Sequence, residues 1–239
     1  ARRGTPAATA QTPAPADSAA LTVDRYAELT SLLMLPPDSM VVAETEITMT
    51  GSTDTFVMKR WYALPQMQRV EVWLGQRLTT ALCTNGRDRY REYRPQLGYW
   101  EDLPPDKFYE RLSGYDLRGP LHSWRAKGCH LTYKGGVRAK EGVRLKAVKV
   151  EAPGLYTRDY LFEPSGLLAV ILESDEMMDS AEYRRIEDTR IEWKMVHEYQ
   201  YVGRALLPRV ESFMRDGLLT VLTTTARVEP RKSLMFNQD

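Results

Sequence analysis

The chain has 239 residues, of which 43% are hydrophobic and 27% are charged. Its 33 basic and 32 acidic residues nearly cancel, so no strong overall field draws it to nucleic acid or to an acidic membrane surface. No apolar run approaches the eighteen or so residues that a membrane-spanning helix needs. We therefore expect a folded protein without a nucleic-acid partner, acting in water or at a membrane surface.

The first segment, residues 1–20, is dominated by Ala, Pro, Thr and Ser and carries no large apolar side chain. Such a composition buries too little surface to offset its ordering entropy, which predicts a disordered, flexible tether. A tether of this kind suits an exported protein, and we expect the precursor to carry a signal peptide. From Leu21 to Leu33, apolar residues recur at helical spacing until Pro36-Pro37 ends the run, which predicts a helix.

Beyond Asp38 the hydrophobic period falls to two, which is typical of a strand with one buried face. Asn85-Gly86 is a strong signal for a tight hairpin, because both residues tolerate positive φ. The successive turns indicate an antiparallel meander. The predicted strands of this first half cover residues 41–49, 55–63, 67–74, 77–84 and 87–94.

The middle of the chain predicts two short helices, over residues 106–112 and 117–127, before strands resume. The expected fold is mainly β: one domain over residues 21–239, with a curved antiparallel sheet that forms an incomplete barrel. About three helices would cover the concave side, because an open meander must bury one face. The predicted strands of the second half cover residues 129–134, 143–151, 155–163, 167–174, 185–201, 205–215 and 218–229.

Five segments, taken together in their order and spacing, carry a family pattern: LPQMQRVEV (64–72), CTNGRDRY (83–90), residues 116–148, EYQYVGRALLPRVESF (198–213) and VEPRKSLMF (228–236). They resemble the LolA/LolB-like superfamily, and in particular its outer-membrane lipoprotein-sorting proteins. The resemblance implies a LolA-like half-barrel in the periplasm or at the outer membrane. It further implies a lipid, a lipoprotein acyl chain or another apolar molecule as ligand, and an envelope protein as a possible partner.

Sequence motifs for catalysis or metal binding are absent. His122, His130 and His197 have no metal-ligand spacing, and the chain has no G-x-S-x-G elbow and no phosphate-binding glycine loop. We expect no cofactor, no metal and no enzymatic activity. Cys83 and Cys129 fit either two buried thiols or one disulfide.

Apolar side chains on the first strands are the candidate ligand contacts. Methionine is flexible and polarisable, which suits an acyl chain, although ordinary core packing explains the same residues. Arg60 alternates with these residues, so it is either a cation facing a lipid carbonyl or phosphate, or an edge arginine in solvent. Which face is concave stays open. The candidates are Met49, Phe56, Met58, Arg60, Tyr62, Trp73 and Leu82.

Three functional hypotheses are consistent with the sequence. The leading hypothesis is a periplasmic binding protein that holds an apolar ligand in lipoprotein or lipid trafficking, with peripheral or anchored membrane association. The second is an envelope structural, interaction or sensor protein whose cavity is filled by its own side chains. The third is an enzyme without standard motifs. Arg87, Arg89 and Arg91 are expected on one strand face, which is either solvated or faces a membrane headgroup or an acidic partner.

Overall fold

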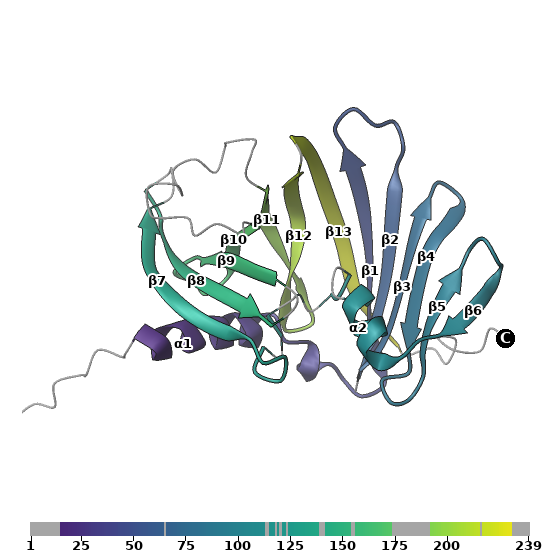
Figure 1. The fold of residues 1–239 in the computed structure, drawn as a ribbon, viewed down its shortest axis with the longest axis horizontal. Helices are drawn as coiled ribbons and strands as arrows, with labels where there is room; N and C mark the ends of the chain where they lie inside the picture. The colour runs from purple at the N-terminus through teal and green to yellow at the C-terminus, as the bar shows by residue number, and fades with distance from the viewer. Residues whose placement is uncertain are drawn as a thin grey trace, which may run out of the picture.

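A computed structural model describes residues 15–230, apart from residues 65, 113–114, 118, 120, 123, 139–141, 154–155, 174–191 and 216. Thirteen strands form one sheet, in which every neighbouring pair is antiparallel. The strand order is β6-β5-β4-β3-β2-β1-β13-β12-β11-β10-β9-β8-β7 (Figure 1). Because β6 and β7 are separate edges, the sheet is open, and the prediction of one antiparallel sheet that does not close is confirmed.

The strands follow the period-two pattern closely, and β3, β4 and β12 have the predicted bounds. The short strand β6 carries no periodic signal and was not predicted. The bounds are β1 (Ser39–Met49), β2 (Phe56–Ala63), β3 (Met67–Leu74), β4 (Arg77–Thr84), β5 (Tyr90–Arg94), β6 (Tyr99–Asp102), β7 (His130–Arg138), β8 (Arg144–Ala152), β9 (Tyr156–Phe162), β10 (Leu168–Glu173), β11 (Glu192–Val202), β12 (Ala205–Arg215) and β13 (Leu218–Pro230).

The first helix, α1 (Pro15–Leu29), begins six residues before the predicted start at Leu21. Its first residues therefore correct part of the predicted tether of residues 1–20, and Ala19 is fully buried in the core. Proline is well tolerated in a first helical turn and alanine is the best helix former, so this stretch extends the helix without any large apolar residue. Residues 1–14 lie outside the described residues.

A helix over residues 117–127 was predicted and is wrong. Gly119 has φ +77°, which an α-helix cannot contain, and the described residues after it form turns. The amide of Cys129 donates to the Trp124 carbonyl at 3.1 Å. The described residues therefore contain two α-helices, α1 and α2 (Pro105–Leu112), and the 3-10 helix η1 (Leu32–Met34), in place of three covering helices.

The turn segment after Leu121 fastens α1 in place. Arg125 forms two hydrogen bonds of 2.7 Å with the Asp24 carboxylate of α1, and Trp124 Nε1 donates to the same group at 3.0 Å. The Arg125 guanidinium lies 4.2 Å from the Trp124 ring centroid. These contacts lower the pKa of Asp24, the Arg125 hydrogen bond most of all. The segment is a polar clamp on the helix instead of a third helix.

Both α-helices cover the same face of the sheet, which we call the helix-covered face. In the strand registers, Met58 lies beside Val72, and Arg60 lies beside Val70, which lies beside Leu82. Phe108 of α2 packs on these side chains. At the other end of the sheet, α1 packs on residues of β8–β10 that include Val148, Tyr160 and Ile171. The strand registers place these residues on the same face of the sheet as Met58. Figure 1 shows α1 near β7 and β8, and α2 near β1–β5.

The predicted tight hairpin at Asn85-Gly86 is a five-residue loop. Oδ1 of Asn85 accepts hydrogen bonds from the backbone amides of Arg87, Asp88 and Arg89, at 3.0, 3.1 and 3.1 Å. These bonds keep residues 87–89 out of the ladder, so β5 begins at Tyr90. The prediction that three arginines share one strand face is therefore wrong.

The sequence left open whether the two cysteines are buried thiols or form a disulfide, and the structure answers this question. Cys83 lies on β4 and Cys129 lies just before β7, and both are buried free thiols. Burial raises the pKa of Cys83 to about 11, and it also raises the pKa of Cys129. The described structure is held by its sheet and core without a disulfide.

Candidate functional site

Six of the seven predicted site residues lie on the helix-covered face. Every second residue of β2 lies on this face, namely Phe56, Met58, Arg60 and Tyr62. Leu82 of β4 lies there too, beside Val70 of β3. Met49 alternates with Ile47 at the end of β1, where it is partly exposed. The structure divides these six residues among an apolar patch, a polar cavity, the sheet margin and a separate core cluster, in which Tyr62 is buried.

Trp73 is the exception among the predicted residues. Trp73 pairs with Val57, the residue directly before Met58 on β2. Successive side chains of a strand point to opposite faces, so the Trp73 indole lies on the face opposite Met58. Its Nε1 donates to Glu71 Oε2 at 3.0 Å. Trp73 therefore does not lie with the other candidates, because the apolar residues of β2 and β3 occupy both faces and the sequence alone does not distinguish them.

An apolar patch lies directly beneath α2. Met58, Val70 and Leu82 are buried there, and Phe108 and Leu112 of α2 pack on them. Phe108 is fully buried and Leu112 is 2% exposed. We call this set the α2-covered patch. Among the described residues, α2 is the α-helix that covers Met58 and Leu82, two of the ligand contacts predicted from the sequence.

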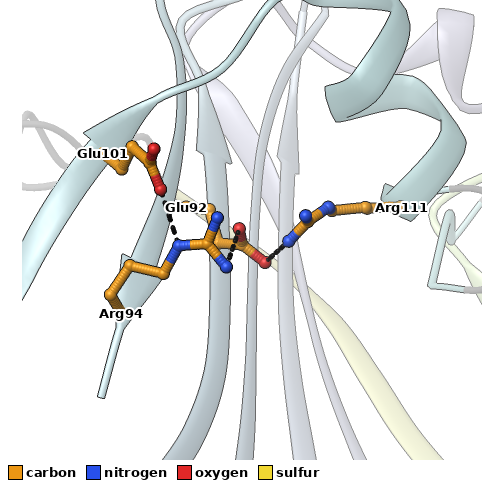
Figure 2. Close-up of polar contacts among 4 residues, drawn as sticks. All are labelled: Glu92, Arg94, Glu101 and Arg111. Carbon is orange, nitrogen blue, oxygen red and sulfur yellow. Dashed lines mark hydrogen bonds and ion pairs between the residues drawn. The ribbon is translucent and has the colours of Figure 1, made fainter. Parts of the chain in front are cut away.

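A charged cluster at the edge of this patch ties α2 to the sheet (Figure 2). Arg111 of α2 forms an ion pair with Glu92 of β5, and Arg94 lies 3.1 Å from the other oxygen of the same carboxylate. Arg94 also donates from Nε to Glu101 of β6 at 2.6 Å. Glu92 is only 7% exposed, so the bond from Arg111 lies at a partly dry interface, where it is stronger than an exposed pair.

A polar cavity of about 60 Å³ lies further along the helix-covered face. It is bounded by α1, by β2, by β10–β12 and by the segment before the clamp. One water molecule needs roughly 10–15 Å³ of such space, so the cavity holds only a few waters. Sites for drug-sized ligands measure roughly 300–1,000 Å³, and this cavity is therefore closed to an acyl chain in the present conformation.

Arg60 is the central side chain of the cavity. Its Nη2 donates to Thr45 Oγ1 at 2.7 Å, and Thr45 Oγ1 lies 2.8 Å from Thr224 Oγ1. Its Nε is shielded from solvent and has no hydrogen-bond partner among the described residues. Burial lowers the pKa of Arg60, while the charges of Glu211 and Asp116 oppose that effect. An arginine stays protonated under such conditions, so the Nε–H is a permanent donor without an acceptor.

The charges around the cavity balance. Its described walls carry two basic residues, Arg60 and Lys194, and two acidic ones, Asp116 and Glu211. Lys194 and Glu211 form an ion pair of 2.6 Å between β11 and β12. The buried phenol of Tyr26 lies near the same carboxylate; burial, followed by the Glu211 charge, raises the pKa of Tyr26. The site is polar but has no net charge.

The sequence reading missed part of this site. Val70 carries a period-two signal and belongs to the α2-covered patch. Lys194 and Glu211 carry no such signal, because charged residues in strands normally face water. They meet through the pairing of β11 with β12, and Asp116 lies on the segment that follows α2; a sequence pattern reveals neither position.

Other kinds of site find little support in the described part of the chain. Among these residues, no group of three His, Cys, Asp or Glu side chains is placed to hold a metal ion. None of the described helices is long and apolar enough to cross a membrane. The acidic stretch over residues 174–182 lies outside the described residues.

Comparison with known proteins supports the fold. No family model matches this sequence, and no curated protein is significantly similar to it. A LolA superfamily protein from Nitrosomonas europaea has a similar structure, with a TM-score of 0.58 and 11% identity over 90% of this chain and 94% of that one. A lipoprotein-sorting protein domain from Vibrio parahaemolyticus gives a TM-score of 0.57 at 12% identity, over 93% and 96% of the two chains.

A third similar structure is a DUF1329 family protein from Desulfovibrio piger. It gives a TM-score of 0.56 at 11% identity, over 89% of this chain and 92% of that one. At these identities the similarity concerns the fold. The chain therefore has a LolA-like fold, as its sequence motifs predicted.

Proposed function

We propose that this protein is a periplasmic, cell-envelope binding protein that takes up an acyl chain or a similar apolar ligand on its helix-covered face. The observation that carries the proposal is the α2-covered patch, in which Met58, Val70 and Leu82 are buried beneath Phe108 and Leu112 of an eight-residue helix. The LolA-like fold supports the same function, since one protein of similar structure is described as a lipoprotein-sorting domain. No catalytic step is required.

Uptake at the α2-covered patch requires α2 to move, because Phe108 and Leu112 already pack on Met58, Val70 and Leu82. Exposing Phe108 and Leu112 to water costs about 3–6 kcal/mol, at roughly 1.5–3 kcal/mol for each side chain. Burying ten methylenes of a ligand in their place returns about 8 kcal/mol, at roughly 0.8 kcal/mol each. An acyl chain of that length or longer therefore offsets the displacement of α2, before association and ordering costs.

The test is uptake of a fluorescent fatty acid by the full chain and by Met58→Asp. A carboxylate at the centre of the patch opposes burial of an acyl chain, so uptake should fall at least tenfold. The matched control is Val57→Asp, which places the same charge on the next residue of β2 but on the opposite face. Circular dichroism of both variants checks that they fold. Equal uptake by Met58→Asp and the wild type would exclude the patch as the site.

A self-filled envelope interaction protein is the second candidate function. Two observations favour it. Phe108 and Leu112 already cover the patch, and the polar cavity further along the same face is small. Folded wild-type protein that takes up neither a fatty acid nor an acyl ester would select this alternative. A catalytic function has less support, because Lys194 and Glu211, two of the titratable groups at the cavity, already pair with each other.

A further inference from the structure

Arg60 carries a buried hydrogen-bond donor that has no acceptor in the part of the chain that the structure describes. Its Nη2 is engaged by Thr45, whereas its Nε is buried with no partner among the described residues, and the side chain lines the cavity. A buried donor without an acceptor is costly, so such groups usually meet a water molecule or a ligand. The cavity beside Arg60 has room for a few waters or for a small polar group of similar size.

The charges at the cavity determine which polar group fits. Arg60 and Lys194 are balanced by Asp116 and Glu211, so an added carboxylate or phosphate would bring an uncompensated negative charge into a partly dry site. Glu211 and Asp116 also act directly on Arg60. An uncharged acceptor, such as the carbonyl oxygen of an ester or amide, accepts the Nε–H bond without adding charge.

The cavity adjoins the α2-covered patch along one strand. Met58 and Arg60 are two residues apart on the same face of β2, which corresponds to about 7 Å. Arg60 lies beside Val70, and Met58 lies beside Val72, so the polar and apolar parts are continuous across β2 and β3. An amphiphile whose chain displaces α2 over Met58 therefore places its first polar atoms beside Arg60.

We infer that Arg60 is the head-group contact of the site and selects acyl esters or amides over free fatty acids. This inference rests on the proposed function and adds the chemical class of the ligand. Arg60 donates one hydrogen bond from its charged guanidinium to a neutral carbonyl of the ligand. The charged residues of the described cavity walls already balance one another.

The experiment compares three ligands of equal chain length below their micellar concentrations at pH 8. They are 1-monolauroylglycerol, which has an ester carbonyl; 1-O-dodecylglycerol, the ether without it; and laurate, the anion. Titration calorimetry on the full-length wild type should give at least tenfold tighter binding of the ester than of either other ligand. This comparison requires no variant to fold.

Variants then assign the preference to Arg60. Arg60→Met should reduce affinity for the ester to that of the ether and leave ether binding unchanged, whereas Arg77→Met, at an exposed arginine of β4, should leave the preference intact. Equal wild-type affinity for ester and ether, tighter binding of laurate, or a preference that survives Arg60→Met would overturn the inference and leave the proposed function standing. Absence of binding by all three ligands would overturn both.

Discussion

Single polar side chains decide local structure at points where the strand pattern is ambiguous. The clearest case is Asn85, whose Oδ1 accepts three backbone amides and whose Nδ2 donates to Asp88 at 2.8 Å. Gly86 follows with φ +73°, and a Cβ at this position would lie 2.7 Å from the carbonyl carbon of Gln66. The two residues therefore hold a loop against the neighbouring turn, where the dipeptide alone predicts a two-residue hairpin.

Asn85→Ala should lower the free energy of unfolding by about 1–2 kcal/mol, because three amides of the loop lose their acceptor to water. The control is Asp88→Ala, which removes only the bond from Nδ2 and should cost less than about 0.5 kcal/mol. Urea denaturation of both variants measures the difference. Equal losses would show that Oδ1 of Asn85 does not organise the loop.

At the scale of elements, α2 is held by two different kinds of contact. Phe108 and Leu112 bury apolar surface over the patch, and Arg111 reaches Glu92 at its edge. Lys107 and Glu110 instead form an exposed pair within the helix, at 3.0 Å. Tyr109 of α2 also packs edge-on against Tyr90 of β5, with 5.6 Å between the ring centroids. Unlike the exposed pair, the apolar contacts and the Arg111–Glu92 ion pair join α2 to the sheet, so they set how readily the helix moves away from it.

Arg111→Ala should raise the population of displaced α2 about fivefold, since a partly buried ion pair of this kind contributes roughly 1 kcal/mol. Uptake of a fluorescent fatty acid should accelerate by a similar factor in stopped-flow measurements. Glu92 keeps Arg94 as a partner, which limits damage to the sheet. Lys107→Ala is the matched control and should leave the uptake rate unchanged. Acceleration by both variants alike would point to general loosening of the helix.

For the whole molecule, the sequence predicts the sheet better than its cover. Alternation of apolar and polar residues predicts the strands because one-face burial acts along the strand itself. The helix over residues 117–127 was wrong because the positive φ of Gly119 ends helical structure there. The cavity could not be predicted, because Arg60, Lys194 and Glu211 meet only through strand pairing across the sheet. The early start of α1 was missed because Ala19 buries without a large side chain.

The central claim is that an acyl ligand takes the place of α2 on the helix-covered face. An isolated eight-residue helix is unstable in water, so a displaced α2 should also lose its backbone protection. Hydrogen exchange of the full chain, measured with and without saturating 1-monolauroylglycerol, reports this directly. We predict faster exchange of residues 105–112 when ligand is bound, with α1 unchanged. Equal or slower exchange of residues 105–112 at saturation would contradict the account.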